Sequence, residues 1–80
     1  MKIKIGSVVR SKTGRDSNGM FAVVGIDEKY VYICDGKERP VERPKRKNPK
    51  HISATKIIID AEEMQTNRKL KKALKNYQSI

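Results

Sequence analysis

The chain has 80 residues, of which 19 are lysine or arginine and 9 are aspartate or glutamate, so its formal net charge at pH 7 is +10. This length corresponds to one domain with a small core, and the charge favours polyanions, nucleic acid above all, as partners. The single cysteine excludes an internal disulfide and a zinc finger, and no apolar run is long enough for a transmembrane helix.

The first predicted strand runs from Lys2 to Val9. Ile3 and Ile5 alternate with lysines, a period of two that places both isoleucines on one face. A polar loop follows, from Arg10 to Gly19, with two glycines and three cationic side chains. The loop is therefore basic and held between two strands.

The second predicted strand covers Met20–Ile26. Met20, Ala22 and Val24 fall on one face, while Phe21 and Val23 fall on the other. Because both faces are apolar, this should be the most buried strand.

A third strand is predicted for Tyr30–Cys34. Asp35-Gly36 then favours a tight hairpin turn, because glycine and aspartate tolerate the positive φ that a type I′ turn needs. The hairpin leads to a fourth predicted strand from Lys37 to about Glu42, and Pro40 inside it predicts an edge position.

A strongly basic segment follows from Arg43 to Lys50, with the sequence RPKRKNPK. It could be a solvated, self-repelling linker, or it could contact a polyanion. Seven cations between Lys37 and Lys50 are offset by only two glutamates, a surplus that opposes compaction unless a polyanion neutralises it. We expect binding.

The last part of the chain changes its period. A connector is predicted at residues 51–55, and a short strand at 56–59 that pairs with the first strand. Asp60 and Glu63 then resemble a capping box, which predicts a helix of about 16 residues with a break allowed near 66–67. Its apolar stripe either packs on the strands or docks on a partner, and consists of Leu70, Ala73, Leu74 and Tyr77.

These elements predict a mainly β fold. Five short strands with frequent turns favour a small SH3-like five-stranded barrel at residues 1–59, which includes the basic loop 43–51. A basic amphipathic C-terminal α-helix follows at residues 60–80. We expect a monomer.

The sequence resembles the KOW domain, and more narrowly the small KOW-domain RNA-binding proteins akin to a large-subunit ribosomal protein family. The resemblance covers roughly residues 3–55. The matching segments are Ile5–Val9, Gly14–Asp16, Val23–Val24, Tyr30–Ile33, Asp35–Gly36 and Pro44–His51.

The resemblance implies an SH3-like barrel of the KOW type and an RNA-binding role for residues at matching positions. Gly14 matches the glycine of the KOW motif, although it could also be only a turn glycine. The loop residues that inherit an RNA-binding role are Arg10, Lys12, Gly14 and Arg15. The corresponding residues of the basic segment are Arg43, Lys45, Arg46, Lys47, Lys50 and His51.

Some side chains have more than one interpretation. Tyr30 and Tyr32 could stack on bases, but alternating tyrosines are more often core residues with a solvated hydroxyl. Cys34 is expected to be a small buried apolar residue. As the only histidine, His51 cannot form a histidine cluster for a metal, so it is expected to pack or to contact phosphate.

The function predicted from these features is RNA binding. No catalytic arrangement of residues is evident, so we expect neither an enzyme nor a metal or other cofactor. The expected partners are rRNA or another structured RNA and ribosomal proteins, without a membrane, in the cytoplasm, because the first residues lack the apolar core of a signal peptide. The alternative is an SH3-like protein-interaction module of the transcription or translation machinery.

Overall fold

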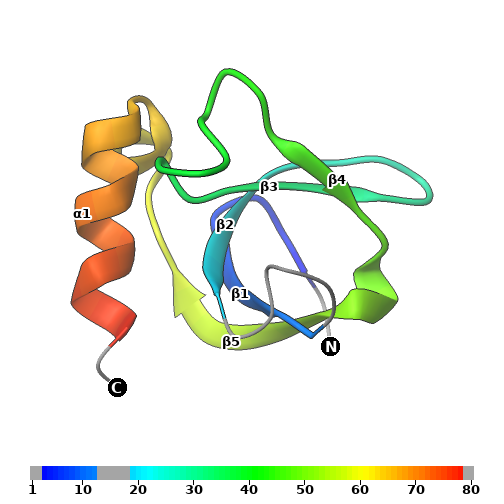
Figure 1. Ribbon diagram of the computed structural model, residues 1–80. Coiled ribbons are helices and arrows are strands. Elements are labelled where there is room, and N and C mark those ends of the chain that lie inside the picture. Colours follow the sequence, from blue (N-terminus) through cyan, green and yellow to red (C-terminus); the bar gives the residue numbers. More distant parts are fainter. Residues whose placement is uncertain (1–2, 13–18, 79–80) are drawn as a thin grey trace.

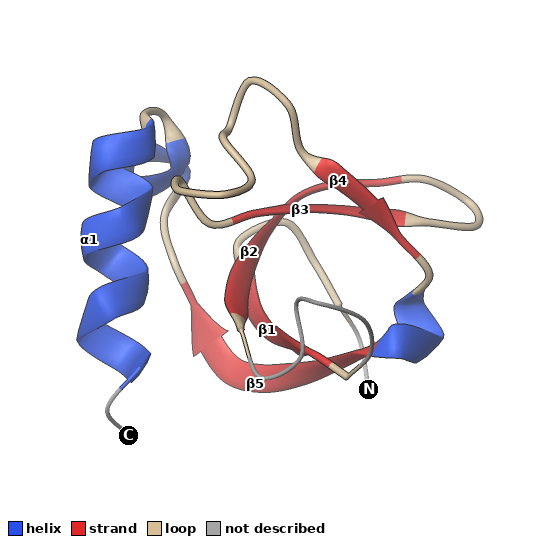
Figure 2. Cartoon of the chain, in the orientation of Figure 1, coloured by secondary structure: helices blue, strands red, loops and turns tan. Residues whose placement is uncertain are grey.

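The computed structural model describes residues 3–12 and 19–78, which form one curved antiparallel sheet with a helix on one side (Figure 1). The order of the strands in the sheet is β4-β3-β2-β1-β5. The strands are β1 (Ser7–Ser11), β2 (Met20–Ile26), β3 (Val31–Cys34), β4 (Lys45–Lys47) and β5 (Ile52–Ile58). The helical elements are the 3-10 helices η2 (Pro49–His51) and η3 (Ala61–Met64) and the α-helix α1 (Asn67–Gln78) (Figure 2). A mainly β fold with a C-terminal helix is thereby confirmed.

Apolar side chains cover both faces of the sheet, and β2 contributes to each. On the face that carries α1, Met20 and Ala22 pack with residues of the helix. On the opposite face, Phe21 and Val23 pack with residues of β1, β3 and β5. The prediction that β2 is buried on two faces is confirmed, although its last residue, Ile26, is exposed.

The first strand is shorter than predicted, because it begins at Ser7 and not at Lys2. Gly6 has a φ of +95°, and the Ser7 amide donates to the Lys4 carbonyl at 2.9 Å, so the chain turns just before the strand. Ile3 packs against the sheet while Ile5 is 56% exposed. The two isoleucines therefore do not share a strand face, and the prediction from their alternation is wrong.

The predicted hairpin after Asp35 is also wrong in its second half. Gly36 does have a positive φ, of +80°. However, the Asp35 carboxylate accepts hydrogen bonds of 2.9 Å from the amides of Lys37 and Arg39, which closes a loop in place of a strand. The fourth strand forms later, at Lys45–Lys47, inside the basic segment.

The fifth strand is longer than predicted, since the expected connector at residues 51–55 belongs almost entirely to β5. β5 pairs with β1, from Ser11 opposite Ile52 to Ser7 opposite Ile58, which confirms the predicted partner. In the described part of the chain, β4 and β5 each have one neighbour and form the two edges of the sheet.

The C-terminal helix is divided in two, near the predicted break. Asp60 precedes η3 but its side chain makes no capping hydrogen bond, so the predicted capping box is wrong. The cap of α1 is Thr66, whose hydroxyl accepts from the Lys69 amide at 3.1 Å.

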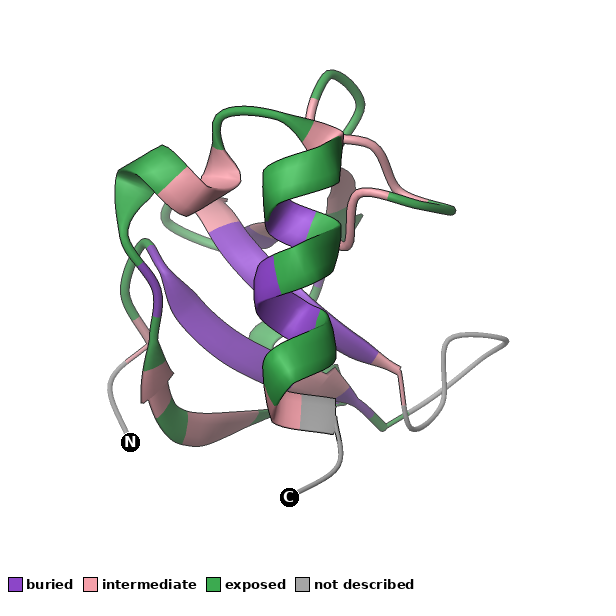
Figure 3. Cartoon of the chain, turned by 90° about the vertical axis from the view of Figure 1, so that its left-hand side faces the viewer, coloured by how far each residue is buried: buried purple, intermediate pink, exposed green. Residues whose placement is uncertain are grey.

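The apolar stripe of α1 packs on the chain's own sheet, as predicted. Leu70, Ala73 and Leu74 are buried, and Tyr77 packs beside them. Figure 3 shows α1 in front of the sheet, with buried stretches of the helix alternating with exposed ones. The stripe therefore packs against residues of β1, β2 and β3.

Candidate nucleic-acid interface

Two basic segments that are far apart in the sequence meet where β1 ends and β5 begins. The Lys12 amide donates a hydrogen bond of 2.8 Å to the His51 carbonyl, next to the last pair of the β1–β5 ladder, Ser11 opposite Ile52. Lys12 and Lys50 both line a shallow groove of about 350 Å³. We call this the β1–η2 groove; its lining residues are Ile3, Lys12, Pro49, Lys50, Ile52, Ser53 and Ala54.

The local sequence of η2 fixes this arrangement. Asn48 has an extended backbone, and its side-chain oxygen accepts from the Lys50 amide at 2.9 Å, while its carbonyl accepts from the His51 amide at 2.9 Å. Pro49 favours the first position of the turn because its φ is fixed and it lacks an amide hydrogen. Lys50 and His51 are therefore held exposed on a defined turn.

β4 shows that the basic segment is not simply a linker. Lys45 lies opposite Ile33, Lys47 lies opposite Val31, and Arg46 lies opposite Tyr32. Alternation along the strand leaves Arg46 exposed, whereas Lys47 is only 8% exposed. Lys47 consequently offers little of its side chain to an external ligand.

Arg46 lies against a tyrosine of the neighbouring strand region. Its guanidinium carbon is 4.7 Å from the centre of the Tyr30 ring, within the range of a cation–π contact. Beside it, the Tyr32 hydroxyl donates to the Asp27 carboxylate at 2.6 Å. Both tyrosines are half-buried, so they lie at the surface and not in the core.

The turn before β3 positions Asp27 for this contact. One carboxylate oxygen of Asp27 accepts from the amides of Lys29 and Tyr30, at 2.8 and 2.7 Å, and the other accepts from Tyr32. Sequence reasoning missed this cluster, although aspartate in a turn commonly accepts from the amide two residues on, as Asp27 does from Lys29.

These hydrogen bonds shift two pKa values in opposite directions. The bond from the Tyr32 hydroxyl, followed by those from the Tyr30 and Lys29 amides, lowers the pKa of Asp27 below its usual 3.8. The same bond to the Asp27 carboxylate raises the pKa of Tyr32 above its usual 10.0. The contact is therefore complete at neutral pH. It is lost as the pH falls through the lowered pKa of Asp27 or rises through the raised pKa of Tyr32.

We expect Asp27→Ala to lower the pKa of Tyr32 back towards the usual value for tyrosine, because the hydrogen bond that raises it is lost. The measurement is an NMR titration of the tyrosine ring signals. Glu28→Ala is the matched control, because Glu28 is also an acid of this turn but makes no hydrogen bond to the phenol in the described structure. An unchanged Tyr32 pKa in Asp27→Ala would contradict the role assigned to this bond.

The remaining predicted RNA-binding residues have different settings. Arg10 is half-buried within β1, between Met20 of β2 and Ser53 of β5, and Ser53 lines the β1–η2 groove. Arg43 is exposed just before β4. Gly14 and Arg15 lie outside the described residues.

Cys34 is not placed to act as a nucleophile. It is fully buried between the sheet and α1, and burial raises the pKa of its thiol to about 11. At pH 7 this thiol is therefore protonated. Over residues 3–12 and 19–78, no three side chains of the histidine, cysteine, aspartate or glutamate type form a group that could hold a metal ion. Among the described residues, no helix has the length and apolarity needed to cross a membrane.

Comparison with protein-family models finds none that matches this chain, and comparison with curated proteins likewise finds no match. The function of the site must therefore be inferred from the structure alone. The structure has exposed cations around the β1–η2 groove and an arginine stacked on a tyrosine. The described residues contain no metal-binding cluster.

Proposed function

We propose that this protein is an RNA-binding module that contacts rRNA or another structured RNA through its phosphates, in the setting of the ribosome and translation. The observation that carries the proposal is the hydrogen bond between Lys12 and His51, because it joins the two basic segments into one surface. Contacts from lysine side chains to phosphates carry no information about the bases. Binding would therefore depend on the shape and charge of the RNA more than on its sequence.

We further propose that the curved sheet is an SH3-like barrel of the KOW type. Its supports are the five antiparallel strands, the pairing of the last strand with the first, and the burial of apolar residues on the face opposite α1. In this interpretation, the β1–η2 groove is the part of the barrel at which cations, Lys12 and Lys50, contact RNA.

The test is the salt dependence of RNA binding. The double variant Lys12→Gln/Lys50→Gln should bind a structured RNA more weakly than the parent, and should flatten the slope of log affinity against log salt by about 1.5 units for two lost phosphate contacts. Its melting temperature should change little, because exposed charges contribute little to stability. Fluorescence anisotropy at several salt concentrations gives the affinity and its salt slope, and thermal denaturation gives the melting temperature.

The matched control is Lys29→Gln/Lys56→Gln, which removes the same charge from exposed positions outside the β1–η2 groove. Its slope should remain closer to that of the parent. If the two double variants behaved alike, only the net charge would matter and the groove assignment would be wrong. Co-sedimentation with ribosomal subunits at low and high salt then tests the proposed setting.

A further inference from the structure

The helix α1 presents a second set of cations. Its sequence contains five lysines and arginines and no acidic residue, and all five are exposed. Leu70 and Leu74 anchor the helix on the sheet, so the orientation of these cations is fixed by the core. The residues are Arg68, Lys69, Lys71, Lys72 and Lys75.

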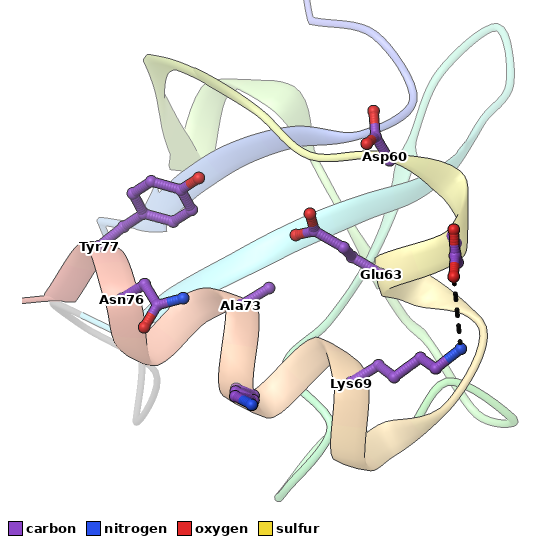
Figure 4. Close-up of a pocket in the computed structure, with 8 residues that line it drawn as sticks. Asp60, Glu63, Lys69, Ala73, Asn76 and Tyr77 are labelled. Carbon is purple, nitrogen blue, oxygen red and sulfur yellow. Dashed lines mark ion pairs between the residues drawn. The ribbon is translucent and has the colours of Figure 1, made fainter.

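On one side of α1 the protein supplies its own counter-charges. A pocket of about 360 Å³ between η3 and α1 is lined by three acidic residues together with Lys69 and Lys72. Lys69 forms an ion pair with Glu62 at 3.8 Å, drawn as a dashed line in Figure 4. The acidic residues are Asp60, Glu62 and Glu63. Cations on this side are thus partly neutralised within the chain.

The other side of α1 has fewer carboxylates: Glu42 lies beside it and accepts from the Asn67 side chain at 2.9 and 3.0 Å. A groove of about 500 Å³ runs along this side, with no carboxylate among its described lining residues. We call it the helix groove; it is lined by Gly36, Asn67, Arg68, Lys71, Lys72 and Lys75. A neighbouring hollow shares Lys71 and Lys75 and adds Lys37. Asp35 borders that hollow, but one of its oxygens already accepts from two loop amides.

The helix groove has the form that a linear polyanion requires. Arg68, Lys71 and Lys75 are spaced at i, i+3 and i+7, so they form a row about 10 Å long on one side of the helix. Gly36 forms part of the wall without a side chain, in direct contact with the backbone of α1. A chain of phosphates could approach the row of cations closely, and each contact would release counterions.

The position of this groove separates it from the β1–η2 groove. In Figure 1, α1 lies at the left of the molecule and η2 at the lower right, with the strands between them. The two grooves share no lining residue. This placement favours separate segments of nucleic acid over a single continuous contact.

We propose that the helix groove binds the phosphate backbone of a second RNA segment, so that one protein molecule joins two RNA segments. This inference rests on the proposed RNA-binding function and adds a second site to it. Joining two segments also raises the effective concentration of each for the other, which strengthens binding to a folded RNA that presents both.

The experiment is a capture assay with two copies of one RNA hairpin, one immobilised on beads and one fluorescent. The parent protein should bring the fluorescent hairpin to the beads. The triple variant Arg68→Gln/Lys71→Gln/Lys75→Gln should reduce capture at least about tenfold while it still binds a single hairpin, because a bridge between two hairpins needs both sites. Lys4→Gln/Lys29→Gln/Lys56→Gln removes the same charge elsewhere and should retain capture.

Sedimentation of the captured complex gives its composition. A complex of one protein with two hairpins supports the inference, whereas two proteins in each bridged complex would overturn it. Capture by the triple variant at the level of the parent would also overturn it. If the parent binds single hairpins but captures none, the second site is refuted and the proposed function stands; if the parent binds no hairpin, the proposed function itself fails.

Discussion

Replacing Gly36 by alanine should lower the free energy of unfolding by about 2 to 5 kcal/mol. Gly36 has a φ of +80°, where a side chain costs about 1 to 2 kcal/mol. A Cβ there would also collide with the Asn67 carbonyl oxygen and come within 3.1 Å of the Lys71 amide nitrogen. These atoms belong to the backbone of α1 and cannot rotate away, so relief of the overlap should cost about 1 to 3 kcal/mol more.

Urea denaturation followed by circular dichroism measures this loss. Gly25→Ala is the matched control, because Gly25 has no positive φ and the nearest atoms to its Cβ would belong to the Tyr32 side chain, at 3.4 Å or more, which is an ordinary contact. We expect the control to cost less than about 1 kcal/mol. If the two variants lost the same free energy of unfolding, the close contact between Gly36 and α1 would not limit which residue can stand at position 36.

Leu70→Ala should cost about 3 to 5 kcal/mol. Leu70 is fully buried in the cluster that joins α1 to the sheet, and truncation of a buried leucine leaves a cavity as well as removing apolar contact. Because a helix of this length is marginal without tertiary packing, helical signal should be lost together with the rest of the structure in one transition.

Leu70→Met is the control for shape, since it keeps most of the volume and should cost less than about 1.5 kcal/mol. Lys69→Ala, at the exposed neighbouring position, is the control for helix propensity. If Leu70→Ala unfolded at the urea concentration of the parent, α1 would not depend on docking for its stability.

Patterns that reflect burial on a strand or a helix could be predicted from the sequence. Met20–Ile26 is apolar on both faces, and the stripe from Leu70 to Tyr77 has helical spacing; both have the expected positions in the core. The strand at Lys45–Lys47 could not be predicted, because its composition is that of a solvated segment. It becomes a strand only through its partner β3 and the core beneath it.

Competition between side chains and backbone explains the other errors. The Asp35-Gly36 pair gave the correct backbone conformation for the glycine, but the Asp35 carboxylate captured the amides that a hairpin would have used. At the helix start, Asp60 and Thr66 are both good caps, and only Thr66 is placed at the first turn of α1. For the candidate site, the sequence predicted which cations to consider, while the contact between Lys12 and His51 depends on how β5 pairs with β1.

The composition of β4 has a consequence for how these molecules behave towards one another. An exposed edge strand can pair with a strand of another molecule and start aggregation. Among the described strands, β4 is an edge of three cationic residues, of which Arg46 is exposed, so a second copy aligned against it would bring like charges together. This charge repulsion would act on the protein alone, without a bound partner. The short, cationic edge therefore disfavours self-association of the protein through β4.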